Sequence, residues 1–190
     1  MSRLAIHGGT VIDPGNGIHG RRDLAIEDGH IRAVEPSIPL GDASDVIDAT
    51  GLLVVPGLVD LHVHVYWGVA DLSIRAGSHD LARGATTIVD AGSAGANTLP
   101  GFREYVIERF DGRILAFLNI SAMGQIDPFL GENHDLRYLI PERAAETVLA
   151  DPERLVGIKV RLTEEIRWHR RRNATPWRHA ARRVSRPERR

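Results

Sequence analysis

Apolar and polar residues alternate in two different rhythms along the chain, and the change comes at Pro56. Before it, short alternating segments are separated by tight turns such as Asp28-Gly29, a strong hairpin signal. This pattern predicts a strand, a glycine turn and a second strand over 4–13. Further strands are predicted over 23–27, 30–34, 45–48 and 52–55. We therefore expect residues 1–55 to form a small N-terminal β-sandwich segment.

From Pro56 onward, apolar strand-like segments alternate with helix-like segments. The strands are predicted over 58–64, 85–90, 113–120 and 155–162, and the helices over 71–83, 100–109 and 141–150. Such alternation is typical of parallel βαβ units. Four units in about 110 residues correspond to half of a (β/α)8 barrel, whose full length is about 250 residues. The predicted fold class is therefore α/β, with a partial TIM-type barrel over 56–165.

The composition excludes several kinds of chemistry. The chain has no cysteine, so disulfides, thiolate catalysis and cysteine-ligated metals are excluded. No apolar run approaches the roughly 18 residues of a membrane span, and no secretory signal pattern follows Met1. We therefore expect a cytoplasmic protein that does not contact a membrane.

Charge divides the chain at about residue 165. Residues 1–165 carry 14 basic and 24 acidic residues, whereas residues 166–190 carry ten arginines and one glutamate. The second segment has no apolar periodicity, which predicts a disordered tail. Its arginines also raise the alternative of nucleic-acid binding through phosphate contacts, which we rank lower because the whole chain favours arginine over lysine.

Two histidines stand at the end of the first barrel strand, in the stretch Val59-Asp60-Leu61-His62-Val63-His64. Residues two apart in a strand share a face, so His62 and His64 project together. Neutral imidazoles are good ligands for divalent ions such as zinc. A pair of hydrated histidines at a strand end is an equally open interpretation of this motif alone.

The chain has a single lysine, Lys159, and it lies late in the fourth predicted barrel strand. An ammonium group within an apolar parallel strand is costly unless its charge is removed or paired. An amine that reaches water at the barrel mouth, or that pairs with a carboxylate such as Asp90, would meet this requirement without a metal.

Several motifs together resemble the amidohydrolase superfamily, and within it the dihydroorotase-like amidohydrolase/deacetylase metallohydrolases. The resemblance covers residues 4 to about 164. The motifs are Ile6-His7-Gly8-Gly9-Thr10-Val11-Ile12-Asp13, Asp28-Gly29-His30-Ile31, Asp48-Ala49-Thr50-Gly51, Val55-Pro56-Gly57-Leu58-Val59-Asp60-Leu61-His62-Val63-His64, Tyr66-Trp67-Gly68, Asp90-Ala91-Gly92-Ser93-Ala94-Gly95, Leu118-Asn119-Ile120-Ser121 and Gly157-Ile158-Lys159-Val160-Arg161.

The resemblance implies a metal centre. His62 and His64 would bind a zinc ion, and Lys159, carboxylated by carbon dioxide, would bridge to a second ion, so one or two divalent ions are implied. Arginine cannot take this role, because its guanidinium stays protonated. The implied reaction is hydrolysis of an amide, as in a deacetylase, or of an ester in a small-molecule substrate by metal-activated hydroxide.

The resemblance also implies two more histidines from strands five and six and an aspartate acid/base from strand eight. The chain stops matching after strand four, so no catalytic residue is assigned, and His169 and His179 are not taken as ligands. We interpret the sequence after about residue 165 as the product of truncation or a shifted reading frame. We expect the chain alone to be hydrolytically inactive.

The remaining candidates and alternatives are weaker. Asp60 is expected to accept a structural hydrogen bond, and Asp90 either to orient a metal ligand or to lie hydrated in a loop. Asn119 and Ser121 are expected to cap a loop rather than touch substrate, and His79 to lie on a helix surface. A non-catalytic assembly module, in which half-barrels pair as a homo-oligomer, stays an alternative function.

Overall fold

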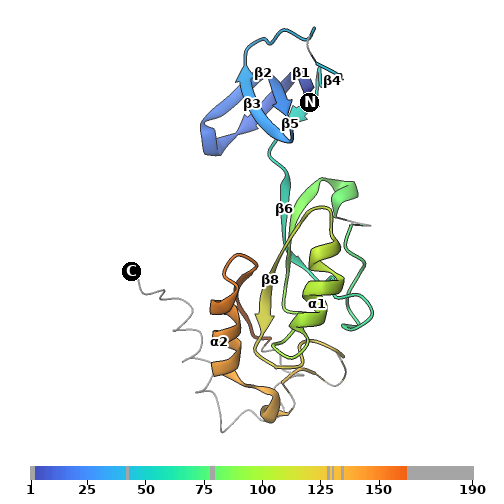
Figure 1. Ribbon diagram of the computed structural model, residues 1–190, viewed down its shortest axis with the longest axis vertical. Coiled ribbons are helices and arrows are strands. Elements are labelled where there is room, and N and C mark those ends of the chain that lie inside the picture. The colour runs from blue at the N-terminus through green and yellow to red at the C-terminus, as the bar shows by residue number, and fades with distance from the viewer. Residues whose placement is uncertain are drawn as a thin grey trace. The chain divides into compact units, whose positions relative to one another are not determined.

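The computed structural model describes residues 3–41, 43–77, 80–127, 129, 131–133 and 135–161. The chain divides into two compact units, Met1–Pro56 and Gly57–Arg190. The predicted disordered tail over 166–190 lies outside the described residues, as does His79. Each unit is described by itself below (Figure 1).

The first unit is one mixed sheet of five strands. The strands are β1 (Arg3–Asp13), β2 (Ile18–Glu27), β3 (His30–Glu35), β4 (Asp45–Asp48) and β5 (Leu53–Val54). Strands β1, β2 and β3 form an antiparallel meander, whereas β4 and β5 pair with β1 in parallel. The β-rich character predicted for this region is confirmed, and a single sheet is what one segment of a sandwich would supply.

The glycines near the start of the chain form a bulge rather than a turn. Strand β1 runs without a break, and its pairing with β2 shifts register between Ile6 and Gly9. Gly8 has φ +76°, a conformation that glycine adopts without steric cost. The predicted strand–turn–strand over 4–13 is therefore wrong in its middle, because the extra residue is absorbed within the ladder.

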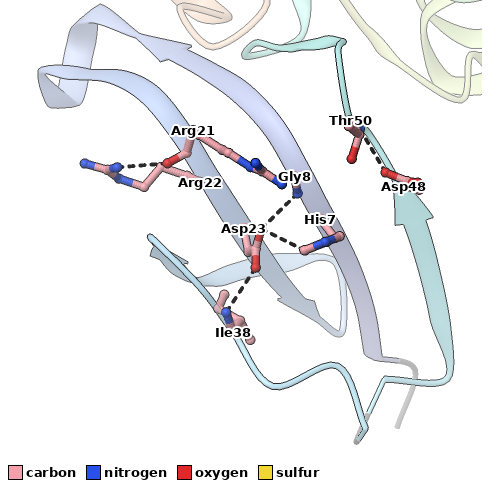
Figure 2. A network of polar contacts seen from close by, with 8 residues as sticks. All are labelled: His7, Gly8, Arg21, Arg22, Asp23, Ile38, Asp48 and Thr50. Carbon is pink, nitrogen blue, oxygen red and sulfur yellow. Dashed lines mark hydrogen bonds and ion pairs between the residues drawn. The ribbon is translucent and has the colours of Figure 1, made fainter.

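A buried carboxylate, Asp23 on β2, fixes this bulge (Figure 2). Its Oδ1 accepts a hydrogen bond of 2.9 Å from the Gly8 N–H and lies 3.1 Å from Nδ1 of His7. Its Oδ2 accepts a bond of 3.1 Å from the Ile38 N–H. The hydrogen bond from Gly8 is the main reason why the pKa of Asp23 lies below its ordinary value, although burial opposes the shift.

This lowered pKa predicts an acid-sensitive sheet. The contribution of Asp23 to stability is present above about pH 4 and is lost as the pH falls through the pKa of the folded state. We expect Asp23→Asn to destabilise the chain at pH 7 and to reduce the further loss of stability between pH 5 and pH 3. Urea unfolding of both proteins across this range measures the effect.

The matched control is Asp45→Asn, since Asp45 is an exposed aspartate at the start of β4. It should leave the pH dependence as in the wild type. An Asp23→Asn protein with the wild-type pH dependence would contradict the role of the buried carboxylate.

The second unit is built on a parallel sheet of four strands in the order β6-β7-β8-β9. These are β6 (Leu58–Val63), β7 (Ala85–Asp90), β8 (Arg113–Asn119) and β9 (Leu155–Lys159). Helix α1 (Leu99–Tyr105) connects β7 to β8, and α2 (Pro141–Ala150) connects β8 to β9. Each strand therefore pairs with the next along the chain, as in the first half of a barrel.

Helices α1 and α2 pack against the same face of this sheet, because their buried residues belong to one apolar core with those of the strands (Figure 1). The core is filled around Phe102 of α1, which is fully buried and lies 4.9 Å from the Tyr66 ring. The strand residues of this core are Val63, Ile88, Ile114, Ala116, Leu118 and Leu155. The opposite face of the sheet is left for other side chains.

The predicted helix over 71–83 is wrong among the described residues. Residues 71–77 form turns and coil, and only Leu81–Arg83 makes a short 3₁₀ helix. The Asp71 N–H donates to the Ile126 carbonyl and the Ile74 N–H to the His64 carbonyl, so these donors bind other loops instead of the preceding turn. Gly77, at φ +89°, adds a left-handed residue that interrupts a helix.

Strand β6 carries apolar side chains on exposed positions. Leu58, Val59 and Leu61 are 53%, 53% and 71% exposed, and among the described residues β6 pairs only with β7.

Within the described part of the chain, no helix is long and apolar enough to span a membrane.

Candidate metal centre

The two histidines of the His-x-His motif lie at the carboxyl end of β6. His62 is within the strand and exposed, and His64 follows its last residue and is half-buried. Their rings are 5.5 Å apart between centroids and inclined at 73°. Val63 and Val65, on either side of His64, belong to the apolar core on the helix-covered face. Since side chains alternate along a strand, both histidines project to the opposite face.

Lys159, the last residue of β9, lies on the same face as the histidines. The pairing of β8 with β9 shifts register after Ala116, so that Ile158 pairs with Leu118 and Lys159 with Asn119. Ile158 and Leu118 pack in the core under the helices. Lys159 therefore points away from the helices, because its neighbour Ile158 points toward them.

Gly92, in the loop after β7, makes room for the lysine stem. A Cβ atom at this position would lie 2.6 Å from both Cβ and Cγ of Lys159. The aliphatic part of Lys159 therefore packs directly against the backbone of this loop. Strands β6 and β9 thus bring His62, His64 and Lys159 to one end of the sheet, where barrel sites gather.

Burial is the main cause that lowers the pKa of His64 below its ordinary value. The negative charge of Asp90 opposes this effect, whereas the positive charges of His62, Lys159 and Arg161 add to it. A lowered pKa favours the neutral imidazole, which is the form that binds a metal.

A chain of hydrogen bonds runs from His64 into the protein. Nδ1 of His64 lies 2.9 Å from the Ser93 hydroxyl, which donates a bond of 2.8 Å to Oδ2 of Asp90. Asp90, the last residue of β7, is fully buried and also accepts bonds from the backbone N–H groups of Val65, Gly92 and Ser93. The expectation of a hydrated loop carboxylate is therefore wrong, because four donors enclose Asp90.

Two of the other candidate residues, Asp60 and Asn119, bind backbone groups near the ends of the strands. Asp60 accepts a bond of 3.0 Å from the His62 N–H, as expected for a structural acceptor. Asn119 is buried, donates to the Gly92 carbonyl and accepts from the Ser121 N–H. Both the NH₂ group and the carbonyl oxygen of the Asn119 side chain therefore make hydrogen bonds. Ser121 is buried as well, and its hydroxyl has no hydrogen-bond partner among the described residues.

Sequence reasoning missed two features of this end of the sheet. The motif over 90–95 gives Ser93 no role of its own, although Asp90-x-x-Ser93 after a strand is a spacing at which an aspartate caps a following turn. The second feature is an ion pair of 3.1 Å between Arg161 and the buried Glu132. It ties the loop after β8 to the end of β9, next to Lys159.

The residues present fit part of a zinc site. A zinc ion about 2.0–2.1 Å from one nitrogen of each ring, with tetrahedral angles, places the two ring centroids about 5 Å apart. The separation of 5.5 Å between His62 and His64 is close to this value. No three His, Cys, Asp or Glu side chains of the described residues cluster as a cation site. A third donor would therefore be another kind of group, and Lys159 can be one only without its ammonium charge, for example as a carbamate.

A cavity of about 650 Å³ lies elsewhere in the second unit. Residues at the amino ends of β8 and β9, among them Arg113 and Val156, line it. In a parallel sheet this is the end away from His62 and His64, so the cavity is not part of the candidate centre.

Known proteins match this chain over most of its length. The model of the Amidohydrolase family matches residues 45–102. A protein named deacetylase from Brucella anthropi is 41% identical over 144 residues, which are 75% of this chain and 36% of that protein. A deacetylase from Agrobacterium fabrum is 41% identical over 140 residues, which are 73% of this chain and 34% of that protein. The chain thus spans about a third of the length of these curated relatives.

A solved structure described as a dihydroorotase is 33% identical to the chain, with a TM-score of 0.82 over 98% of this chain and 50% of the other. An adenine deaminase structure, at 24% identity and a TM-score of 0.75 over 97% of this chain and 47% of the other, shares the fold. The predicted α/β fold class, a partial TIM-type barrel after a β-rich segment, is confirmed. The motifs, the parallel sheet and these matches lead to one conclusion: the chain belongs to the amidohydrolase superfamily.

Proposed function

We propose that this chain carries part of the metal centre of a hydrolase that cleaves an amide, as a deacetylase does, or an ester in a small-molecule substrate. The observation that carries the proposal is the meeting of His62, His64 and Lys159 on one face at the carboxyl end of the sheet. Relatives named deacetylase and dihydroorotase support the same class of reaction.

His62 and His64 would hold a zinc ion through one ring nitrogen each. When bound, a zinc ion polarises a carbonyl group and makes a water molecule more acidic. The protein residues prepare this site in two ways. Burial lowers the pKa of His64 and so favours its neutral form, and the Ser93 hydroxyl lies within hydrogen-bond distance of its Nδ1.

Lys159 would supply the bridging ligand after carboxylation. Its neutral amine attacks carbon dioxide, a carbon–nitrogen bond forms, and one proton leaves, so that an anionic carbamate replaces a cationic ammonium. This change suits a side chain whose stem is packed against Gly92 within the sheet. A carbamate offers two oxygens, which is what a ligand shared by two cations requires.

The proposal includes that this chain alone does not turn over substrate. The resemblance implies two further histidines and an aspartate acid/base from later strands, and among the described residues no three His, Cys, Asp or Glu side chains cluster as a cation site. Without a group that protonates the leaving nitrogen or oxygen, hydrolysis loses about 10²- to 10⁴-fold from that step alone.

Zinc binding and carboxylation test the proposal directly. We expect zinc, titrated into the full chain and followed by NMR of the histidine rings, to shift the signals of His62 and His64 together. The double variant His62→Ala/His64→Ala should lose this binding. The control His19→Ala removes an exposed histidine of the first unit and should bind zinc as the wild type does.

The single lysine makes the second measurement specific. In ¹³C-bicarbonate buffer we expect a lysine carbamate signal that is absent in Lys159→Arg, where any remaining carbamate signal comes from the α-amino group. Zinc binding that survives loss of both histidines, or hydrolysis of an N-acetyl amide by that double variant, would contradict a metal-dependent hydrolase centred on these residues.

A further inference from the structure

The bonds around Asp90 fix the direction of every hydrogen in the chain that leads to His64. Both carboxyl oxygens of Asp90 are placed as acceptors, because backbone N–H groups, which can only donate, point at each of them. Oδ2 of Asp90 accepts from the Ser93 hydroxyl at 2.8 Å and from the Val65 N–H at 2.9 Å. Oδ1 accepts from the N–H groups of Gly92 and Ser93 at 3.0 and 2.7 Å. The single hydroxyl hydrogen of Ser93 is therefore directed at Asp90.

This direction decides which nitrogen of His64 carries a hydrogen. Because the Ser93 hydroxyl gives its only hydrogen to Asp90, its oxygen can only accept from the ring nitrogen 2.9 Å away. Nδ1 of His64 must then be the protonated nitrogen of the neutral ring. Nε2 keeps its lone pair and is the nitrogen free to bind a cation.

The same carboxylate also fixes the backbone beside the ring. The Val65 N–H that Asp90 accepts belongs to the residue directly after His64. Ser93 is 1% exposed and Asp90 0%, so water does not compete for these bonds. Asp90 thus holds the backbone beside His64 directly, and the ring through Ser93.

We infer that Asp90 and Ser93 are positioning residues that hold His64 with a hydrogen on Nδ1 and present Nε2 to a divalent cation. The part that concerns the cation rests on the proposed function, whereas the choice of ring nitrogen does not. A partner that orients a metal-binding histidine in this way typically changes metal affinity by about 10- to 100-fold when it is removed.

The first experiment uses the metal-free wild-type chain. Long-range ¹H–¹⁵N NMR distinguishes the two neutral forms of a histidine ring, and we expect His64 to show the form with hydrogen on Nδ1. His19, exposed on the first unit, serves as the internal reference and should show the form with hydrogen on Nε2 that dominates in water. His64 in that same form would overturn the inference.

The second experiment compares two buried serines. Ser93→Ala removes the link to the ring, and we expect it to weaken zinc binding about 10- to 100-fold and to shift His64 toward the form with hydrogen on Nε2. Ser121→Ala is the matched control, because Ser121 is also 1% exposed at a strand end but its hydroxyl has no partner among the described residues. Ser121→Ala should change neither the zinc affinity nor the ring form of His64.

Zinc binding and the ring form of His64 are separate measurements, and together they distinguish this inference from the proposed function. A wild-type chain that binds no zinc would contradict the proposed metal centre, but the ring form of His64 would still decide the role of Ser93. A Ser93→Ala chain with the wild-type ring form would overturn the role of Ser93, even if both chains bind zinc.

Discussion

Asp90→Asn is expected to lower the free energy of unfolding by about 3 kcal/mol or more, since buried donors left without an acceptor cost about 1–3 kcal/mol each. The carboxylate of Asp90 accepts four hydrogen bonds. An amide keeps one acceptor oxygen and turns an NH₂ group toward the donors that faced the other. Urea unfolding of the wild type and the variant at pH 7 measures the difference.

Asp60→Asn is the matched control for this prediction. Asp60 is an exposed aspartate on the neighbouring strand β6 and accepts one bond, from the His62 N–H. Its variant should stay within about 0.5 kcal/mol of the wild type, as is usual for surface substitutions. Equal losses for the two variants would show that the four bonds of Asp90 do not stabilise the fold.

Gly95→Ala is the second substitution with a large expected effect. A Cβ at this position would lie 1.9 Å from the Ser121 carbonyl oxygen and 2.6 Å from the carbonyl group of Ala122. These are backbone atoms, so no side chain can rotate away. We expect a loss of about 3 kcal/mol, at the upper end of the range for overpacking, seen as a lower urea midpoint.

The surroundings of Gly95 make this clash hard to relieve. The Gly95 carbonyl accepts a bond from the Leu99 N–H at the start of α1, and the neighbouring Ala94 carbonyl accepts one from the Asn119 N–H. Gly41→Ala is the control, because a Cβ there meets no heavy atom within 4 Å. If Gly95→Ala were as stable as Gly41→Ala, the close approach of the two loops would be refuted.

The sequence was sufficient to predict the strands and helices whose pattern is local. The helix over 141–150 has the predicted ends because Pro141 can begin a helix, where its missing N–H costs nothing, and Glu142 favours the first turn. The strands over 45–48 and 85–90 also lie as predicted. The helix over 71–83 does not form among the described residues, because contacts with distant loops determine its backbone.

The candidate centre could be predicted only in part. The shared face of His62 and His64 follows from a period of two, which the sequence displays directly. The face taken by Lys159 does not, because it depends on the register shift between β8 and β9 at Ala116. The link from Asp90 through Ser93 to His64 joins the ends of two strands and the loop after β7, and no pattern within either strand contains it.

The close packing of Gly92 on Lys159 connects the candidate centre to the loop after β7. The lysine stem takes its path to the sheet end because this loop position has no side chain. The same loop holds Ser93, so one short segment sets both the course of the amine and the angle of a histidine ring. A substitution at Gly92 or Ser93 would therefore alter the proposed centre, although neither residue is a proposed ligand.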